Sequence, residues 1–392
     1  MNHSWDIKRL GDICTSELGK TRDEKRNKGS FRPYLCAINV QWDRFDLSEL
    51  KEMRFEDDEY DRYTIRKGDL VICEGGDIGR AAIWDNEQPI YYQNALHRVR
   101  FAEGIDARFI LYYFMFLKKT GILDGRYGKG VTIKHLVKST LVSIPVPVPP
   151  IMEQQRIVSE LDLLNCIIDK KSAQLRDLDA LSQSIFFEMF GDPSLNDKKW
   201  PIKSISDLFD VGSSKRVFES EWRDSGVPFY RAREIVRLSK GEPLEDPIFI
   251  EEALFAEYKQ RYGVPKAGDI MVTGVGTLGI CYLVKDSDRF YFKDGNTLWF
   301  KDKGLCNTRF IKDLYSTDYI KEQIKANAHG ATVGTYTIVN AKNTRVIVPP
   351  IDLQNEYVNK ILKIDAQKEL INESLEQTHH LLNSRMDYYF NE

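Results

Sequence analysis

The chain has 392 residues, 42% of them hydrophobic and 29% charged, and a net charge of −3 at pH 7. This length can bury two ordinary hydrophobic cores, while the weakly acidic balance taken alone disfavours a nucleic-acid-binding protein. There is no run of about 18 apolar residues, and the first residues lack the apolar core of a signal peptide, so we expect a cytoplasmic protein with no membrane contact.

A basic loop between Gly19 and Ser30 is the first distinctive segment. Two acidic residues interrupt its five cations, which are Lys20, Arg22, Lys25, Arg26 and Lys28. A single loop of this kind is more typical of a solvated surface than of a binding site. Shortly after it, Tyr34 and Asn39 are polar types that could contact the edges of nucleic-acid bases.

Residues 1–148 have the pattern of an α/β domain. Short alternating apolar runs at 69–74 and 81–84 predict strands of a strongly curved antiparallel sheet, and the stretch near 106–119 predicts a helix. Four prolines then end the domain, because proline continues neither a strand ladder nor a helix. They are Pro145, Pro147, Pro149 and Pro150.

A long helix is expected from residue 152. Apolar positions recur at alternating spacings of four and three from Ile157 to Met189, which is a heptad seam of about five repeats. The helix should end at Phe190, because a glycine and then a proline follow it. At about 1.5 Å per residue it would be on the order of 55–60 Å long. A helix of this length requires a packing partner.

The second half of the chain repeats the first. Residues 149–154 and 349–354 share Pro-Pro-Ile and a following Gln at a spacing of 349 − 149 = 200. Other matches run through both halves at offsets from 200 − 5 = 195 to 309 − 108 = 201, including Trp5 with Trp200, Arg108 with Arg309, Gly130 with Gly330 and Thr132 with Thr332. A period this long indicates two whole domains rather than a solenoid.

The repeat also supplies the partner for the long helix. Positions 200 residues beyond the first seam carry Ile361, Ile364, Ile371, Leu375 and Leu382. We expect an antiparallel pair, because the second helix must return from the second domain towards the first. Two independent helices, each lying on its own domain, are the alternative.

Both halves place a basic loop at the same point, which favours a functional role for it. Lys215 and Arg216 follow a Gly-Ser-Ser sequence in the second half. Further on, Tyr230, Arg231, Arg233 and Glu234 are types able to contact base edges, and they belong to a loop whose counterpart carries different side chains. A kept framework with changed loop residues indicates two binding specificities, and divergence by drift is the alternative.

The sequence evidence for a catalytic site or a metal site is weak. The G-x-G-x-x-G sequence at 274–279 matches a dinucleotide-binding pattern, but its copy at 74–79 lacks the first glycine and a strand-like run follows, so we interpret it as a hairpin turn. Asp246, Glu257 and Lys259 resemble the carboxylate and lysine set of metal-dependent nucleases. The six cysteines are scattered, which predicts buried thiols and no metal site.

The ordered set of domain, long helix, domain and long helix, with Pro-Pro-Ile-x-x-Gln closing a domain and Phe-Phe-Glu-Met-Phe-Gly-Asp ending a helix, resembles the DNA-specificity (S) subunit of type I restriction-modification systems. The resemblance covers essentially the whole chain. It implies an α+β protein with two pseudo-symmetric α/β target recognition domains joined by two long antiparallel, coiled-coil-like helices. It also implies a non-catalytic subunit that reads a bipartite double-stranded DNA target, one domain per half-site.

The resemblance implies partners as well. Two methyltransferase subunits, which would hold S-adenosylmethionine, are expected to dock on the helices, and restriction subunits to join the full complex, while this chain holds no cofactor. The alternatives are a metal-dependent nuclease, a single-chain DNA methyltransferase, or an orphan S-like adaptor of another defence complex.

These expectations divide the chain into 1–150 and 192–350 as recognition domains, with spacer helices at 151–191 and 351–392. The candidate DNA-binding residues are Lys20, Arg22, Lys25, Arg26, Lys28, Tyr34, Asn39, Lys129, Thr132, Lys215, Arg216, Tyr230, Arg231, Arg233 and Thr332. The candidate docking or structural residues are Pro149, Pro150, Gln154, Phe186, Phe187, Phe190, Pro349, Pro350 and Gln354.

Overall fold

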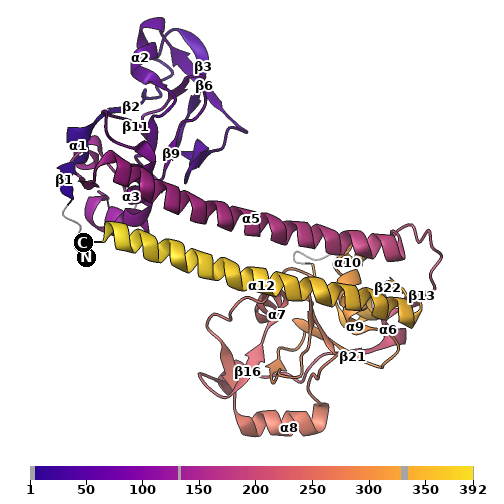
Figure 1. Cartoon of the computed structure of the whole chain (residues 1–392). Coiled ribbons are helices and arrows are strands. Elements are labelled where there is room, and N and C mark those ends of the chain that lie inside the picture. The colour runs from indigo at the N-terminus through magenta and orange to yellow at the C-terminus, as the bar shows by residue number, and fades with distance from the viewer. Residues whose placement is uncertain (1–4, 131–133, 328–333, 392) are drawn as a thin grey trace. The chain divides into compact units, whose positions relative to one another are not determined.

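The computed structural model describes residues 5–130, 134–327 and 334–391. The chain divides into two compact units (Figure 1), here called unit 1 (Met1–Ala173 with Ile371–Glu392) and unit 2 (Gln174–Leu370). Each unit therefore combines a domain from one half of the sequence with helical residues from the other half. None of the helices in the described ranges has the length and apolar character that a membrane crossing needs.

Unit 1 contains two four-stranded sheets. The antiparallel sheet has the order β2-β11-β8-β9 and the other has the order β6-β3-β10-β7, in which β3 and β10 are parallel. The strands of the two sheets are β2 (Cys14–Leu18), β3 (Ser30–Leu35), β6 (Lys51–Phe55), β7 (Thr64–Ile65), β8 (Leu70–Cys73), β9 (Ala81–Ile83), β10 (Ile90–Tyr92) and β11 (Leu96–Phe101). The strands predicted at 69–74 and 81–84 are confirmed as β8 and β9 of the antiparallel sheet, whereas the second, mixed sheet was not predicted, because its parallel pair joins strands far apart in the sequence and leaves no local pattern.

Short strands and helices complete unit 1. They are β1 (Asp6–Arg9), α1 (Leu10–Ile13), η1 (Ala37–Asn39), β4 (Val40–Gln41), β5 (Arg44–Phe45), η2 (Asp57–Glu59), α2 (Tyr60–Tyr63), α3 (Ala107–Lys119), η3 (Leu123–Tyr127), α4 (Lys138–Leu141) and β12 (Pro145–Val148). The helix predicted near 106–119 is confirmed as α3. Pro145 and Pro147, however, lie within β12, which pairs only with β1 and so tolerates proline as an edge strand does.

Unit 2 repeats this architecture. Its sheets have the orders β14-β21-β18-β19 and β15-β17-β16-β20, and β16 and β20 are again parallel. Its strands are β13 (Ile202–Ser204), β14 (Phe209–Gly212), β15 (Trp222–Arg223), β16 (Val227–Tyr230), β17 (Ile248–Ile250), β18 (Ile270–Thr273), β19 (Cys281–Leu283), β20 (Tyr291–Phe292), β21 (Thr297–Asp302) and β22 (Arg345–Ile347). Its helices are α6 (Ile205–Leu208), η4 (Glu219–Glu221), α7 (Ala232–Lys240), α8 (Glu252–Tyr262), α9 (Thr308–Leu314), α10 (Asp318–Asn327) and α11 (Ile338–Asn343).

The G-x-G-x-x-G sequence is a hairpin turn, as predicted. It joins β18 to β19, which pair antiparallel, and β8 and β9 are joined in the same way in unit 1. Gly79 and Gly279 have φ angles of 77° and 76°. A Cβ atom at either position would lie within 2.5 Å of a packed side chain, so the turn requires glycine for both conformation and space.

Two long helices, α5 (Ile151–Phe190) and α12 (Ile351–Phe390), contain 40 residues each. In unit 1, Glu160 pairs with Arg385, and Lys171 donates to the Ser374 carbonyl at 2.9 Å. The residue number rises along α5 as it falls along α12, so the two helices are antiparallel there. Unit 2 has the same order, with Asp179 and Lys368 2.6 Å apart.

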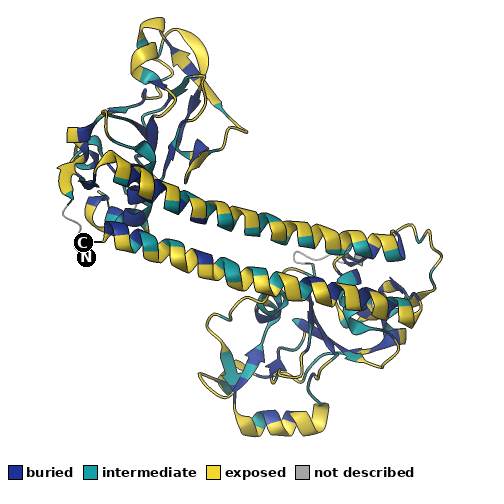
Figure 2. Ribbon diagram, viewed as in Figure 1, coloured by how far each residue is buried: buried dark blue, intermediate teal, exposed yellow. Residues whose placement is uncertain are grey.

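The predicted heptad seam is confirmed. All ten of its positions from Ile157 to Met189 are buried or half-buried, while the outward faces of both helices are largely exposed (Figure 2). The core of unit 1 includes Ile157 and Leu161 from α5 together with Phe390 from α12. The core of unit 2 includes Phe190 from α5 and Ile361 from α12. Independent surface helices are therefore excluded.

Candidate functional site

Three segments of unit 2 meet at the end of its mixed sheet. The Ser214 hydroxyl donates to the Phe292 carbonyl at 2.6 Å, and the Lys215 N–H donates to the Tyr291 hydroxyl at 3.0 Å. The Lys293 N–H donates to the Tyr230 carbonyl at 2.8 Å. Residues 213–217, 230–234 and 291–296 thus form one surface, which we call the unit 2 loop cluster.

The unit 2 loop cluster carries exposed positive charge. Lys215 is exposed, and the Arg216 side chain is 65% exposed although it pairs with Asp294 at 2.9 Å. Arg231 and Lys293 both lie over the ring of Trp222, at 6.0 and 5.8 Å from its centroid. Exposed ion pairs are weak, so an anionic ligand could replace the Arg216 contact at little cost.

A buried carboxylate organises the arginines of this cluster. Glu234 is only 1% exposed, and its oxygens accept from the Arg231 backbone N–H at 2.8 Å and from Arg231 Nη2 at 2.7 Å. It also accepts from Arg233 Nε at 2.6 Å. Burial alone would raise the pKa of Glu234, but the hydrogen bonds from both arginines outweigh it and hold that pKa below its usual range. Glu234 is therefore ionised at neutral pH.

Unit 1 brings the three equivalent segments together, and its bond from Gln93 to Leu35 is the counterpart of the bond from Lys293 to Tyr230 in unit 2. The Lys20 N–H donates to the Tyr92 carbonyl at 3.0 Å, and the Gln93 N–H donates to the Leu35 carbonyl at 2.9 Å. The Asn94 N–H donates to the Lys20 carbonyl at 3.1 Å. Residues 19–30, 36–39 and 92–95 form the unit 1 loop cluster.

Four of the five cations predicted in the first basic loop are on this surface. Arg22 pairs with Glu24 at 2.7 Å and Arg26 with Asp23 at 3.5 Å, and both arginine side chains are more than half exposed. Lys25 and Lys28 are exposed too. Lys20 differs, because its side chain is 9% exposed and pairs with Glu59. We therefore remove Lys20 from the candidate surface and give it a structural role.

Tyr34 and Asn39 also lie inside the protein. Tyr34 is 1% exposed within a small core with Met53 and Phe55. Asn39 is 3% exposed, and its amide donates to the carbonyls of Asp46 and Glu49 at 3.0 and 2.9 Å. Its side-chain oxygen accepts from the Cys36 N–H, just as Glu234 accepts from the Arg231 N–H. These two residues hold the loop and cannot contact a ligand without unfolding it.

The remaining candidate DNA-binding residues are placed as follows. Tyr230 is half-buried and stacks on Phe290, with ring centroids 4.6 Å apart. Lys129 is exposed and forms a β-bridge with His135, whose ring lies 3.0 Å from Glu74. Thr132 and Thr332 lie outside the described residues.

The repeated glutamines fasten the start of each long helix to its domain. Gln154 donates to the Pro149 carbonyl at 2.8 Å and accepts from the Asp106 N–H at 2.8 Å. Gln354 makes the matching bonds to the Pro349 carbonyl at 2.7 Å and from the Asn307 N–H at 2.9 Å. Both glutamines are 1% exposed, so their role is structural. Pro149 and Pro349 are buried, whereas Pro150 and Pro350 are exposed.

The phenylalanines at the end of α5 also fall into a buried group and an exposed group. Phe186 and Phe190 are 4% and 0% exposed and pack against Phe310 and Tyr357 in the unit 2 core. These two side chains stabilise unit 2 and are not accessible to a partner protein. Phe187 is 47% exposed and remains a candidate docking residue.

Sequence reasoning missed Lys293 and Trp222. Lys293 and Trp222 share no residue type with their counterparts, so the repeat did not reveal them. Glu234 was expected to contact a base edge, but it is buried at the N3 position of α7 and binds the N-cap residue Arg231, as Asn39 binds Cys36.

The residues considered for metal-dependent cleavage do not form a site. Asp246 lies between α7 and β17, whereas Glu257 and Lys259 are on α8. The Glu257 carboxylate pairs with Arg261 at 2.9 Å. Within the described ranges, no group of three or more His, Cys, Asp or Glu side chains is placed to hold a metal ion. Of the cysteines, four are buried, Cys14 is half-buried and Cys166 is exposed, and none forms a disulfide.

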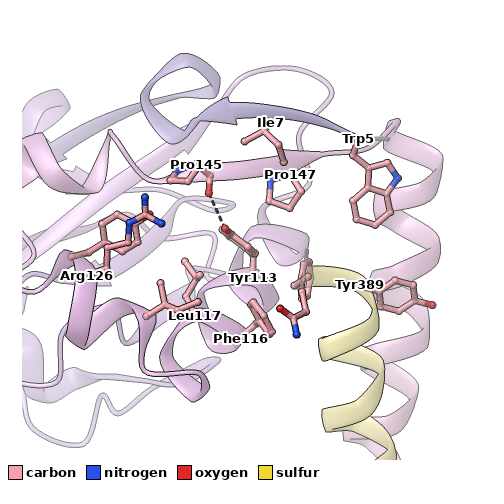
Figure 3. Close-up of a pocket in the computed structure, with 13 residues that line it drawn as sticks. Trp5, Ile7, Tyr113, Phe116, Leu117, Arg126, Pro145, Pro147 and Tyr389 are labelled. Carbon is pink, nitrogen blue, oxygen red and sulfur yellow. Dashed lines mark hydrogen bonds between the residues drawn. The ribbon is translucent and has the colours of Figure 1, made fainter. Parts of the chain in front are cut away.

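Unit 1 has a cavity of about 450 Å³ away from its loop cluster. Figure 3 shows Tyr113, Phe116 and Leu117 of α3 lining it beside Trp5 and Tyr389. The Tyr113 hydroxyl donates to the Pro145 carbonyl at 2.8 Å. The lining is mostly aromatic and aliphatic, and among its described residues no nucleophile contacts a base, so we assign it no chemistry.

Comparison with known proteins identifies what the chain resembles. The family model described as "Type I restriction modification DNA specificity domain" matches residues 2–176 and 197–379. A putative type I restriction enzyme specificity subunit of Haemophilus influenzae is 27% identical over 97% of this chain and 92% of its own length. The MjaIX specificity subunit of Methanocaldococcus jannaschii is 22% identical over 88% of this chain and 83% of its own.

Solved structures show the same fold. The S subunit of a type I restriction-modification system from M. genitalium aligns with a TM-score of 0.58 at 14% identity, covering 100% of this chain and 97% of that one. A chain from a study of complex assembly in the type I R-M system aligns with a TM-score of 0.62 at 16% identity, covering 98% and 97%.

Proposed function

The chain belongs to the type I restriction-modification DNA specificity family, as a specificity subunit with two copies of the recognition domain, and we propose that each loop cluster binds one half of a split DNA target. The observation that carries this proposal is the pair of loop clusters. Both join three equivalent segments and share one backbone hydrogen bond, from Gln93 to Leu35 in unit 1 and from Lys293 to Tyr230 in unit 2, yet they present different side chains. A bipartite target read by two related domains requires such a pairing of common framework and different surface.

Two methyltransferase subunits are proposed to dock on the long helices. Exposed apolar residues recur 200 positions apart on α5 and α12, with Ile151 and Ile351 37% and 47% exposed and Leu181 and Leu381 47% and 48% exposed. Equivalent apolar positions on both helices suit two copies of one partner. In this proposal the partner holds S-adenosylmethionine, restriction subunits join the full complex, and the protein works in the cytoplasm.

The purified chain alone should neither methylate nor cleave DNA in the presence of Mg²⁺ and S-adenosylmethionine. Its charged residues are used in loop positioning and ion pairs, and no catalytic constellation is formed by the described residues. Adding the methyltransferase subunit of its system should give methyl transfer to duplex DNA, measured with labelled S-adenosylmethionine. Metal-dependent cleavage by the chain alone that disappears in Glu257→Ala would overturn the proposal.

Lengthening both long helices should lengthen the unread spacer of the DNA target. Inserting four residues after Ala173 and four after Leu370 adds about 6 Å of helix, comparable to one or two base-pair steps of about 3.4 Å. The seam contacts within each unit keep their pairing, because both insertions lie at the unit boundary. Methylation-site mapping should show unchanged half-sites around a longer spacer.

The matched control inserts four residues after Ala173 alone. This change shifts one side of the seam against the other and rotates it by about 40°, so methylation should fall rather than move to a new spacer. Altered half-site bases with an unchanged spacer in the double insertion would show that the helices do not set the spacing.

A further inference from the structure

One position differs in chemistry between the two loop clusters although both units place it in an equivalent helix-capping arrangement. Arg233 and Ile38 occupy equivalent places, 233 − 195 = 38, two residues after the capping residues Arg231 and Cys36. Both side chains are exposed, with Ile38 57% exposed and the Arg233 side chain 54% exposed. The framework thus presents one outward side chain per unit at this point.

Arg233 is exposed but not free to move. Its Nε donates to Glu234 at 2.6 Å and its Nη2 donates to the Asp246 carbonyl at 3.2 Å. Glu234 is buried and anchored on both sides by the two arginines. The Nη1 donors have no hydrogen bond to any described residue. One edge of the guanidinium is therefore fixed by the protein and the other points outward.

This arrangement distinguishes Arg233 from the other cations of the cluster. Lys215 and Arg216 are exposed and lack a buried anchor, which suits phosphate contacts, since these orient a protein without selecting sequence. Arg231 is only 21% exposed and is largely occupied by Glu234 and Trp222. A guanidinium held in one orientation beside exposed phosphate-binding cations has the geometry needed to read a base.

We propose that Arg233, positioned by Glu234, reads a guanine in the half-site bound by unit 2, an inference that rests on the proposed function. Guanine presents O6 and N7 as adjacent acceptors in the major groove, and arginine is the side chain that most often contacts them. Ile38 has no donor and can offer only an apolar contact, such as one with a thymine methyl group. The two halves of the target then differ at the base pair that this position contacts.

Selection from a pool of random-sequence duplex DNA tests the proposal, using the full chain with the methyltransferase subunit of its system. Arg233→Ala should lose the preference for guanine at one base pair by about 10- to 100-fold. The other half-site and the spacer should stay unchanged. Arg233→Lys should bind random DNA as the unaltered chain does but lose the same preference, because an ammonium cannot reproduce the guanidinium fork.

Three further variants separate the positioning of Arg233 from its charge and from the folding of unit 2. Glu234→Gln keeps the size of the anchor and should relax the same base pair, while circular dichroism reports that unit 2 remains folded. Ile38→Ala, the matched control in unit 1, should alter only the other half-site. Lys215→Ala should weaken binding to all sequences alike.

The outcomes distinguish this inference from the proposed function. A bipartite motif selected by the unaltered chain, with Arg233→Ala selecting the identical motif, would refute the role of Arg233 alone. A full guanine preference in Arg233→Lys would also refute it, by showing that only charge matters. No bipartite motif with the unaltered chain would instead refute the proposed function.

Discussion

Replacing Phe190 by alanine should lower the free energy of unfolding of unit 2 by about 3–5 kcal/mol. Phe190 is fully buried, and its ring centroid lies 4.7 Å from that of Phe310 and 5.2 Å from that of Tyr357. Truncation removes these contacts and leaves a cavity between the long helix and the domain. Neither element can move far enough to fill this cavity. Denaturant unfolding followed by hydrogen exchange of unit 2 amides would measure the loss.

Phe187→Ala is the matched control on the same helix. Phe187 is 47% exposed and lies outside the core, so its replacement should change the free energy of unfolding by less than about 0.5 kcal/mol. Equal losses for the two variants would show that the end of α5 does not complete the unit 2 core in solution.

Replacing Lys25, Arg26 and Lys28 together by alanine should weaken DNA binding by roughly 100-fold at physiological salt. The three side chains are exposed, and the ion pair of Arg26 with Asp23 at 3.5 Å is weak. Each phosphate contact contributes a slope of about 0.9 to the dependence of log affinity on log salt, so the slope should flatten by up to about three contacts. Binding titrations at several salt concentrations would measure it.

The effect on DNA binding should depend on where these charges lie and not on their number alone. Replacing Lys8, Lys170 and Arg176 by alanine removes the same charge from exposed positions outside both loop clusters. Affinity and salt slope should then change little. A loss as large as that of the loop variant, or an unchanged slope in the loop variant, would contradict the assignment of phosphate contacts to the loop.

The duplication made much of the fold readable from sequence. Comparing the copies at 74–79 and 274–279 separated a hairpin turn from a dinucleotide site, and the seam from Ile157 to Met189 predicted the helix pairing. Sheet topology was not readable in this way. The parallel pairing of β3 with β10 joins residues more than fifty positions apart, and each strand contributes only two residues to it.

The candidate site was predicted at the level of segments but not of single side chains. Both basic loops lie where the repeat placed them, yet Lys20 turns inward to Glu59, 39 residues away. Tyr34 and Asn39 are polar types that the fold uses for packing and capping. Periodicity and repeats report backbone position, whereas the direction of a loop side chain depends on distant partners that no local pattern records.

The composition of unit 1 also constrains the order of events on the ribosome. Its core is closed by Met386, Tyr389 and Phe390, which are translated more than 200 residues after Ala173. At about 5–20 residues per second, the apolar surface that receives them would wait roughly 10–40 s during synthesis. Unit 2 lies within one continuous stretch of sequence and needs no such delay. The second unit should therefore finish folding first, and the nascent first unit is where a chaperone would be needed.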